Sequence, residues 1–246
     1  MKDILIITGG SKGIGEGVIN TYVDNGFSVY AVARTINPDL SKRGVVQITF
    51  DLTKVDQIEN VFEHIFSLIG ENEPQKITLI NNAGTLGQIG SLKDIDAVDI
   101  SNTFNLNTIA PFICSSAFIN LTKSWSASKT IINITSGAAL KPYFGWSVYC
   151  SSKAAINMLT QTIALEQQEI ENGVKALAIA PGVVDTDMQK QIRSSNEADF
   201  KDVQRFVNLK NEGGLNDVLN VGQQIFEMDH RKDIASGSVL RVEGKN

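Results

Sequence analysis

Short apolar runs rich in β-branched residues alternate along the chain with longer amphipathic stretches. The apolar runs predict strands at 3–8, 28–33, 45–50, 77–81, 129–134, 174–179 and 237–242. The amphipathic stretches predict helices at 13–25, 55–69, 98–124, 147–171 and 217–228. Strands that alternate with helices form βαβ units, and right-handed crossovers place helices on both faces of a parallel sheet. The pattern therefore predicts one three-layer α/β domain over residues 1–246.

The segment 183–216 interrupts this alternation. It separates a predicted strand from the next predicted helix and is longer than most connections in compact domains. Connections of this length are usually functional or carry short helices of their own. Because the segment follows the carboxyl end of a strand, where open α/β sheets bind ligands, we expect it to form a substrate lid. A purely structural excursion is the alternative.

Composition excludes several classes of function. The 246 residues include 42% hydrophobic and 20% charged residues, which suits a single large soluble domain. A formal net charge of −5 argues against nucleic acid or an anionic membrane as the main partner. No apolar run is long enough for a membrane span or a signal peptide. The two cysteines and two isolated histidines predict no disulfide framework and no metal site, so we expect a cytoplasmic protein with reduced thiols.

A glycine-rich turn follows the first predicted strand. The sequence TGGSKGIG spaces its glycines as G-x-x-x-G-x-G and leads directly into a predicted helix. Glycines at such a turn let the backbone approach a pyrophosphate, and free N–H groups at the helix start bind phosphate. The predicted dinucleotide contacts in this turn are Gly9, Ser11, Lys12, Gly13, Ile14 and Gly15.

Arg34 ends the second predicted strand, and no acidic residue follows it until Asp39. An acid at this point would bind the free 2′-hydroxyl of NAD, whereas an arginine accommodates the 2′-phosphate of NADP. Lys12 lies in the glycine turn on the same side. Two cations without a carboxylate predict NADP(H), and the alternative is that Arg34 only lies at the strand edge in solvent.

The ends of the third and fourth predicted strands offer further cofactor contacts. Asp51 and Leu52 end the third strand, where a carboxylate can accept a hydrogen bond from the adenine amino group. Asn82, Ala83 and Gly84 end the fourth strand, where small residues leave room for the adenosine ribose. Asn82 can also bridge neighbouring strands, so a wholly structural role stays open for it.

The end of the sixth predicted strand faces the other half of the cofactor. Pro181 and Gly182 turn the chain so that the Val184 backbone can face the nicotinamide carboxamide. Thr186 can bind the same amide or a phosphate. Met188 follows at the start of the 183–216 segment and is an expected substrate contact.

Tyr149 and Lys153 stand one turn apart on one face of the predicted helix 147–171. An ammonium beside a phenol favours the phenolate and lowers the tyrosine pKa, which makes Tyr149 a proton donor near neutral pH. Ser136, thirteen residues earlier, can hydrogen-bond the oxygen that takes the proton. This chemistry is carbonyl reduction or its reverse, although a Tyr-x-x-x-Lys pair alone is common enough to need its context.

Three aromatic residues, Tyr143, Phe144 and Trp146, shortly precede Tyr149. Such a cluster before a proton-donating tyrosine predicts a flat, apolar substrate pocket. Tyr143 and Trp146 are expected substrate contacts, while Phe144 is equally compatible with core packing.

The motifs TGGSKGIG and NNAG, followed by Asn107, Ser136, Tyr149-x-x-x-Lys153 and Pro181-Gly182, resemble the classical short-chain dehydrogenases/reductases in identity and order. The resemblance covers nearly the whole chain. It implies a Rossmann-type, doubly wound sheet of seven parallel strands and a homo-oligomer, a dimer or tetramer, that pairs through the helices at 98–124 and 147–171. It also implies a catalytic tetrad of Asn107, Ser136, Tyr149 and Lys153. In that tetrad Lys153 also binds the nicotinamide ribose, Tyr149 lies against the cofactor, and Asn107 holds a water that relays protons.

The stretches SGAALKPYFGWSVYCSSKAA, APGVVDTDMQ and LKNEGGL are similar to the sepiapterin reductase group and, within it, to the bacterial benzil reductase branch. This likeness implies NADPH-dependent reduction of one carbonyl of a small aromatic 1,2-diketone. Pterin-reducing members carry an aspartate in the C-terminal strand, where Arg241 stands here, which favours a diketone over sepiapterin. Sepiapterin or another pterin side-chain diketone remains an alternative substrate. Two further functions stay open: an acyl-carrier or sugar-alcohol reductase and, in a different class, a non-catalytic NADP-sensing protein, for which a damaged tetrad would be expected.

Overall fold

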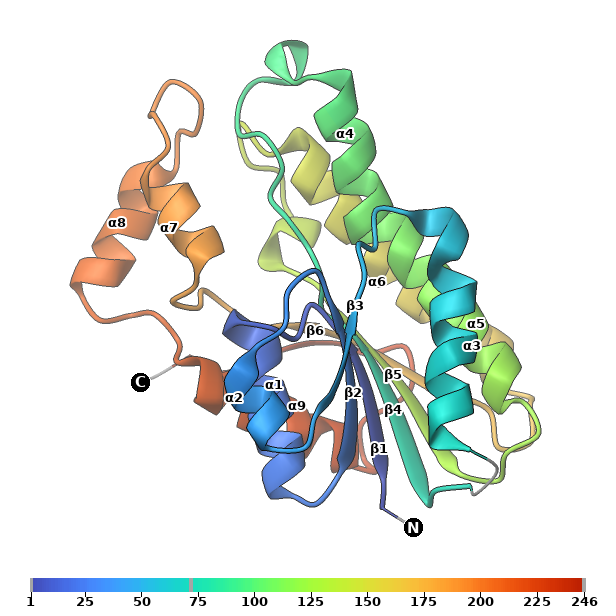
Figure 1. The fold of residues 1–246 in the computed structure, drawn as a ribbon. Coiled ribbons are helices and arrows are strands. Elements are labelled where there is room, and N and C mark those ends of the chain that lie inside the picture. The colour runs from blue at the N-terminus through green and yellow to red at the C-terminus, as the bar shows by residue number, and fades with distance from the viewer. Residues whose placement is uncertain (1, 71–72, 245–246) are drawn as a thin grey trace.

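Seven strands form one sheet in which every pairing is parallel (Figure 1). This computed structural model describes residues 2–70 and 73–244 of the predicted domain, and residues 1, 71–72 and 245–246 lie outside the description. The strand order is β3-β2-β1-β4-β5-β6-β7, which confirms the predicted doubly wound seven-stranded sheet. The strands are β1 (Ile4–Thr8), β2 (Ser28–Ala33), β3 (Val46–Thr49), β4 (Lys76–Asn81), β5 (Ser128–Ile134), β6 (Lys175–Ala180) and β7 (Val239–Arg241).

The strand order reverses between β1 and β4, which lie side by side in the middle of the sheet. β1 is a continuous apolar run whose five residues are all buried, as expected for a parallel strand covered on both faces. Open α/β sheets bind ligands at such a reversal, outside the carboxyl ends of the strands. The glycine turn after β1 and Asn82 after β4 therefore meet at this point.

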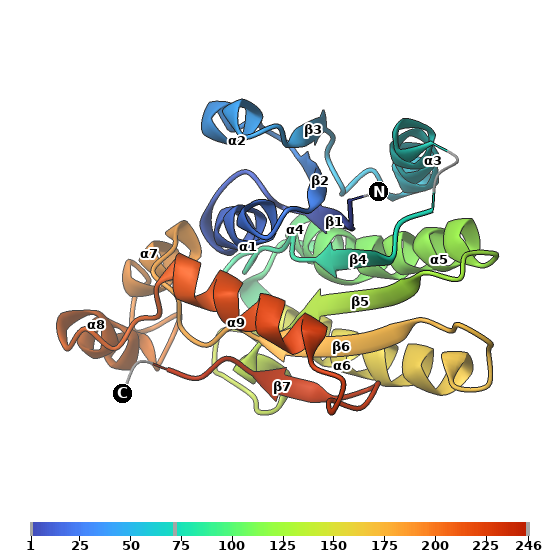
Figure 2. The same ribbon diagram turned by 90° about the horizontal axis from the view of Figure 1, so that it is seen from below.

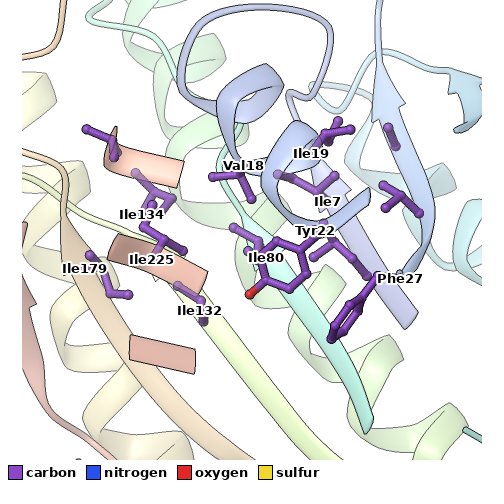
Figure 3. Close-up of a cluster of buried hydrophobic side chains, with 14 of the residues drawn as sticks. Ile7, Val18, Ile19, Tyr22, Phe27, Ile80, Ile132, Ile134, Ile179 and Ile225 are labelled. Atoms are coloured by element: carbon purple, nitrogen blue, oxygen red, sulfur yellow. The ribbon is translucent and has the colours of Figure 1, made fainter. Parts of the chain in front are cut away.

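Helices cover both faces of the sheet, as Figure 2 shows. They are α1 (Gly13–Asp24), α2 (Pro38–Lys42), α3 (Ile58–Ile69), α4 (Ala97–Phe104), α5 (Ala110–Thr122), α6 (Ser147–Gln167), α7 (Asp187–Arg193), α8 (Val203–Asn211) and α9 (Val218–His230). On one face, α1 and α9 pack on the central strands, and Figure 3 shows the side chains that meet there. On the other face, α3 and α5 enclose a second apolar cluster and α6 packs beside them on β6. The three layers match the prediction.

Two predicted helices differ from those observed. The predicted helix 98–124 is a continuous run of α4, a π-helical turn at Asn105–Ile109 and α5. The predicted helix 147–171 ends early at Gln167, because the chain turns through Asn172, which has a φ of 53°, and Gly173. A side chain at Gly173 would overlap the Gln167 carbonyl oxygen, so the turn closes tightly against the helix end.

The 183–216 segment carries two short helices, α7 and α8, beyond the carboxyl end of the sheet (Figure 1). Its two ends meet, because Val184 and Asn216 form an isolated parallel bridge and the Asn216 N–H donates to the Val183 carbonyl at 2.8 Å. The segment thus carries helices of its own, and its expected role as a substrate lid stays a prediction. No helix in the described ranges is long and apolar enough to cross a membrane.

Candidate active site

Ser136, Tyr149 and Lys153 meet at the carboxyl end of β5. Ser136 follows β5 and begins a short 3₁₀ turn, where its hydroxyl accepts a hydrogen bond from the Ala138 N–H at 3.1 Å. Tyr149 and Lys153 project from the first turns of α6 and are 7% and 5% exposed. The Ser136 hydroxyl also lies near enough to the Tyr149 phenol to influence its pKa. The structure thus brings together the hydroxyl, phenol and ammonium that the sequence singles out.

The Lys153 ammonium is held in a buried position. Its Nζ donates to the Ile134 carbonyl oxygen at 2.9 Å, at the end of β5. Burial lowers the pKa of Lys153 to about 8, because a charged ammonium loses its hydration there. This pKa lets the side chain exchange protons close to physiological pH.

The predicted effect of Lys153 on Tyr149 is wrong for the protein alone. Burial is the largest influence on the phenol, and it raises the pKa of Tyr149 above its usual value. The nearby Ser136 hydroxyl lowers this pKa but is the smaller effect. The sequence could not reveal this, because it shows the neighbours of a tyrosine on a helix and not how completely other segments cover the ring. A raised pKa keeps Tyr149 protonated, as a general acid requires.

Asn107 lies in the π-helical turn between α4 and α5 and is fully buried. Its Oδ1 accepts from the Thr85 N–H at 2.8 Å, and its Nδ2 donates to the Thr85 carbonyl at 2.8 Å and to Ser152 Oγ at 3.1 Å. The side chain therefore ties the loop after β4 to α6. Its role in holding a proton-relay water stays a prediction. Thr85 and Ser152 carried no sequence signal, since neither belongs to a motif.

Gly84 leaves space between Asn107 and Lys153. A Cβ at this position would lie 3.2 Å from Asn107 Oδ1 and 3.5 Å from Lys153 Nζ. Both polar groups thus border the same small volume, which a side chain would fill. The predicted need for a small residue here has a direct structural reason.

The glycine turn has the geometry that a dinucleotide phosphate needs. Gly9 and Gly13 have φ values of 70° and 60°, which favour glycine, and a Cβ at Gly9 would lie 2.8 Å from Ala83 Cα. α1 begins at Gly13, and the residue before it, Lys12, makes no side-chain cap. The N–H groups of the first helical turn are therefore without a side-chain acceptor and suit an anionic ligand. This turn and the strand ends around it fit a dinucleotide cofactor.

Asn82 bridges the two central strands, which is the structural role that its position suggested. Its Nδ2 donates to the carbonyl oxygens of Thr8 and Gly9 at 3.0 and 2.9 Å, while Thr8 Oγ1 accepts from the N–H groups of Asn82 and Ala83. These bonds fix the glycine turn against the end of β4. The Asn82 amide thus holds the glycine turn in shape, and its direct contact with a cofactor stays a prediction.

Polar side chains gather where the turn after β2 meets the glycine turn. Thr35 Oγ1 donates to Ser11 Oγ at 3.1 Å, and the exposed residues Arg34 and Lys12 are the sequence neighbours of these two residues. Asp51 lies near enough to Arg34 to feel its charge, but the hydrogen bond from the Thr53 N–H is the main cause of its lowered pKa. The two predicted cations thus lie on the two chain segments that meet here, and their contact with a 2′-phosphate stays a prediction. Thr35 carries no sequence signal of its own, although it directly follows Arg34.

The residues after β6 also approach the glycine turn. Gly182 has a φ of 75°, and Pro181 accepts a hydrogen bond from the Asn216 side chain at 3.2 Å. Thr186 caps α7 through its hydroxyl, and a Cβ at Gly13 would lie 3.4 Å from Thr186 Cγ2. The two predicted cofactor segments, after β1 and after β6, are thus in contact range of each other.

Aromatic residues from the 183–216 segment cover the Tyr149 side of the site. Trp146 is 5% exposed and makes an edge contact with Tyr149, with 5.6 Å between ring centroids. It also packs on Tyr143 and on Phe200 and Phe206 of the segment. Phe200 and Phe206 were not predicted, because nothing in the sequence pairs them with residues more than fifty positions away.

Several neighbours complete this cluster. Met188 is partly buried against it, in keeping with its expected place near the substrate. Phe144 is 50% exposed, so it does not belong to the core, and the Lys201 ammonium lies 5.6 Å from its ring centroid. Trp146 Nε1 is buried and has no hydrogen-bond partner among the described residues.

No group of three or more His, Cys, Asp or Glu side chains in the described ranges is arranged to hold a metal ion.

Comparisons with known proteins agree with this geometry. A family model described as short chain dehydrogenase matches residues 3–197. A benzil reductase ((S)-benzoin forming) of Bacillus cereus is 38% identical over 97% of this chain and 98% of its own, and one of Bacillus subtilis (strain 168) is 40% identical over 87% of each. A sepiapterin reductase of Meriones unguiculatus is 35% identical over 79% of this chain and 73% of its own. Two solved structures, the KRED1-Pglu enzyme and ElxO with NADP bound, superpose with TM-scores of 0.84 and 0.80 at 26% and 25% identity. The first alignment covers 97% of this chain and 100% of the other, and the second covers 98% and 97%.

Proposed function

The chain belongs to the short-chain dehydrogenase family of oxidoreductases, and we propose that it is an NADPH-dependent carbonyl reductase of aromatic 1,2-diketones, of the benzil-to-benzoin type. The observation that carries this proposal is the position of the Ser136–Tyr149 pair beside the buried aromatic cluster of Trp146, Phe200 and Phe206. A proton donor beside flat apolar walls suits a carbonyl conjugated to an aromatic ring. Identities of 38% and 40% to two benzil reductases support the same substrate class.

The chemistry follows from the three polar groups after β5. NADPH, when bound, would supply the hydride that the carbonyl carbon accepts. The Ser136 hydroxyl donates a hydrogen bond to the carbonyl oxygen and stabilises the negative charge that develops there. Tyr149 transfers its phenolic proton to the same oxygen as general acid. Its raised pKa keeps this proton in place until the oxygen becomes basic enough to take it.

Lys153 and Asn107 serve the return of the proton to Tyr149. The Lys153 ammonium would bind the ribose hydroxyls of the cofactor and, with a pKa of about 8, can give up and regain protons in the working pH range. Gly84 keeps open the space that Lys153 Nζ and Asn107 Oδ1 border. A water or a ribose hydroxyl of the cofactor in that space can connect the two side chains.

The choice of NADP(H) rests on Lys12 and Arg34. Both are exposed and adjoin, in sequence, the two residues of the Ser11–Thr35 contact, so an adenosine 2′-phosphate bound there would have two cations within reach. ElxO, at 25% identity, has NADP bound. We extend the proposal to the 183–216 segment as a lid, since its aromatic residues cover the Tyr149 side of the site.

A homo-oligomer is part of the proposal. α5 and α6 expose Phe112 and Met158, which are 45% and 64% exposed and line one groove between the two helices. A twofold pairing of this face would bury both side chains. Light scattering on the purified protein tests it, because a monomer at micromolar concentration would contradict the pairing.

Turnover of benzil tests the central proposal. Purified protein should oxidise NADPH in the presence of benzil, and Tyr149→Phe should lower kcat by about 10²-fold or more, the usual contribution of a general acid. Tyr30→Phe is the matched control, because Tyr30 lies in β2 away from Ser136 and should leave the rate unchanged. A wild-type protein that binds NADPH but reduces no carbonyl in a panel of aromatic diketones, sepiapterin and aldehydes would revive the non-catalytic alternative.

Sepiapterin is the second candidate substrate because of the sepiapterin reductase relatives. Arg241, the last residue of β7, is exposed and stands where pterin-reducing members carry an aspartate. An arginine offers no acceptor to the pterin amino group. We expect a lower kcat/KM for sepiapterin than for benzil in the same assay, and the reverse order would favour the pterin assignment.

A further inference from the structure

An ion pair joins the glycine turn to the first helix of the 183–216 segment. Lys12 Nζ lies 2.8 Å from Asp187 Oδ2, across 175 positions of sequence. The other carboxylate oxygen, Oδ1, lies 3.0 Å from Lys190 Nζ. The hydrogen bond from Lys12 is the largest cause of a lowered Asp187 pKa, and the bond from Lys190 is the next largest. Together they lower this pKa to about 2, so the carboxylate is charged throughout the physiological range. Asp187 thus binds Lys190 of its own helix and Lys12 of the glycine turn at the same time.

A bound 2′-phosphate would compete with Asp187 for the Lys12 ammonium. Lys12 directly follows Ser11, whose hydroxyl accepts a hydrogen bond from Thr35, and Arg34 directly precedes Thr35. A 2′-phosphate seated there would carry close to two negative charges, against one on Asp187. The phosphate attracts Lys12 more strongly than the carboxylate does and repels the carboxylate directly. Lys12 cannot keep its full contact with Asp187 when such a phosphate is bound.

We propose that Asp187 is a specificity-determining residue that competes with the cofactor 2′-phosphate for Lys12, so that a phosphorylated dinucleotide releases one of the ties that hold α7 to the glycine turn. The proposal rests on the proposed use of NADP(H). It assigns to Asp187 two linked effects: a weaker intrinsic affinity for the 2′-phosphate and a looser α7 once that phosphate is bound. NAD(H), which lacks the phosphate, would leave the tie intact.

The solvent exposure of the Lys12–Asp187 pair limits how much Asp187 can change the affinity for a 2′-phosphate. The Lys12 and Asp187 side chains are 74% and 58% exposed, so water screens the pair and its contribution is small. Removing the carboxylate should therefore tighten binding of a 2′-phosphate ligand by about two- to fivefold. An effect of this size is measurable by calorimetry and is largest at low salt.

Adenosine 2′,5′-bisphosphate and AMP are suitable probes, since they differ only in the 2′-phosphate and do not reach the Tyr149 side of the site. Asp187→Asn should lower the Kd of the bisphosphate about two- to fivefold and that of AMP by less. Asp185→Asn is the matched control, because Asp185 pairs with Lys210 at 2.6 Å within the same segment and should leave both constants unchanged. In a Lys12→Gln background the gain from Asp187→Asn should shrink, because the competition for Lys12 has gone.

Hydrogen exchange tests the second effect. The bisphosphate should speed exchange of the α7 amides in the wild-type protein, whereas AMP should not. The bisphosphate should have little further effect in Asp187→Asn, where the tie is already absent. Protection of α7 by the bisphosphate in the wild-type protein would overturn the release of the tie.

The affinities separate this proposal from the proposed cofactor. If the wild-type protein binds the bisphosphate no better than AMP, the assignment of NADP(H) is wrong and the role of Asp187 falls with it. If the wild-type protein prefers the bisphosphate but Asp187→Asn tightens both ligands equally, or Asp185→Asn gives the same gain, the cofactor assignment stands and only the competition for Lys12 is overturned.

Discussion

The indole of Trp146 and the ring of Phe200 lie parallel, with 4.4 Å between their centroids and 12° between their planes. Trp146 precedes α6 and Phe200 belongs to the 183–216 segment, so this stack attaches the segment to the helix that carries Tyr149. The turn before Phe200 also sits directly on Gly145, where a side chain would overlap the Asp199 carbonyl oxygen. The aromatic wall of the site therefore depends on contacts between two distant parts of the chain.

Phe200→Ala should loosen the segment and impair substrate binding. Phe200 is fully buried, so loss of its ring should lower the free energy of unfolding by about 3 kcal/mol. The KM for benzil should rise more than the KM for NADPH, because the stack borders Tyr149 and not the glycine turn. Denaturant unfolding and steady-state kinetics measure the two effects.

Phe66→Ala is the control for this prediction. Phe66 on α3 packs on Trp125, away from the aromatic cluster, and its loss should destabilise the protein without changing the KM for benzil. Equal effects of the two variants on that KM would mean that Phe200 acts only through general stability.

Arg34→Ala should weaken NADPH far more than NADH. A charge-assisted hydrogen bond contributes about 1.5–3 kcal/mol, so loss of the guanidinium should raise the Kd of NADPH by about 10- to 100-fold. Arg43→Ala is the matched control, since Arg43 pairs with Asp24 on α1 and has no predicted cofactor contact. A similar loss of affinity for both dinucleotides would place the Arg34 side chain away from the 2′-phosphate.

The parts of the site that the sequence predicts well are those set by local geometry. Gly9 and Gly13 need positive φ, and Tyr149 and Lys153 share a face because of the helical repeat. Each of these constraints operates within a few residues. These local constraints and the strand pattern together suffice to predict the parallel sheet and to identify the residues at its ligand-binding edge.

The remaining features depend on which distant segments meet, and no local pattern carries that information. Phe200 covers Trp146, and Lys12 reaches Asp187, only because the 183–216 segment folds back over the sheet edge. The pKa of Tyr149 rises for the same reason, since the ring is covered by residues far from it in sequence. The expectation of a lowered pKa left this burial out, and in the protein alone burial is the larger effect.

Gly84→Ala should impair catalysis while the protein remains folded. The added Cβ would lie 3.2 Å from Asn107 Oδ1 and 3.5 Å from Lys153 Nζ, so the methyl group occupies the space between the two side chains. Displacing polar groups at a reacting centre by a fraction of an ångström or more can cost up to about 10²-fold in rate, and we expect kcat/KM to fall by at least about tenfold.

Gly90→Ala provides the comparison, because its Cβ would make an ordinary contact with Ile95 Cδ1 at 3.6 Å in the same loop region. It should leave kcat/KM unchanged. Full activity of Gly84→Ala would show that the space between Asn107 and Lys153 is not needed for the reaction.

The buried ammonium of Lys153 should make stability depend on pH in a defined window. Its pKa is about 8 in the folded protein and 10.5 without burial, so between these values the unfolded chain binds more protons than the folded one. The cost of burying the charge is therefore present in full below about pH 8 and falls as the pH rises towards 10.5. One pKa unit corresponds to about 1.4 kcal/mol, so the change across the window is about 3 kcal/mol.

Lys153→Met isolates this contribution, because methionine fills a similar volume without a charge. Below pH 8 the variant should be more stable than the wild-type protein, and the difference should shrink as the pH is raised from about 8 to about 9.5. Urea unfolding at several pH values measures it. Tyr22 and Tyr149 have raised pKa values and would make both proteins less stable above about pH 10, so the comparison stays below that point. A difference that is constant from about pH 7 to about 9.5 would contradict a lowered Lys153 pKa, and with it the proton exchange assigned to this side chain.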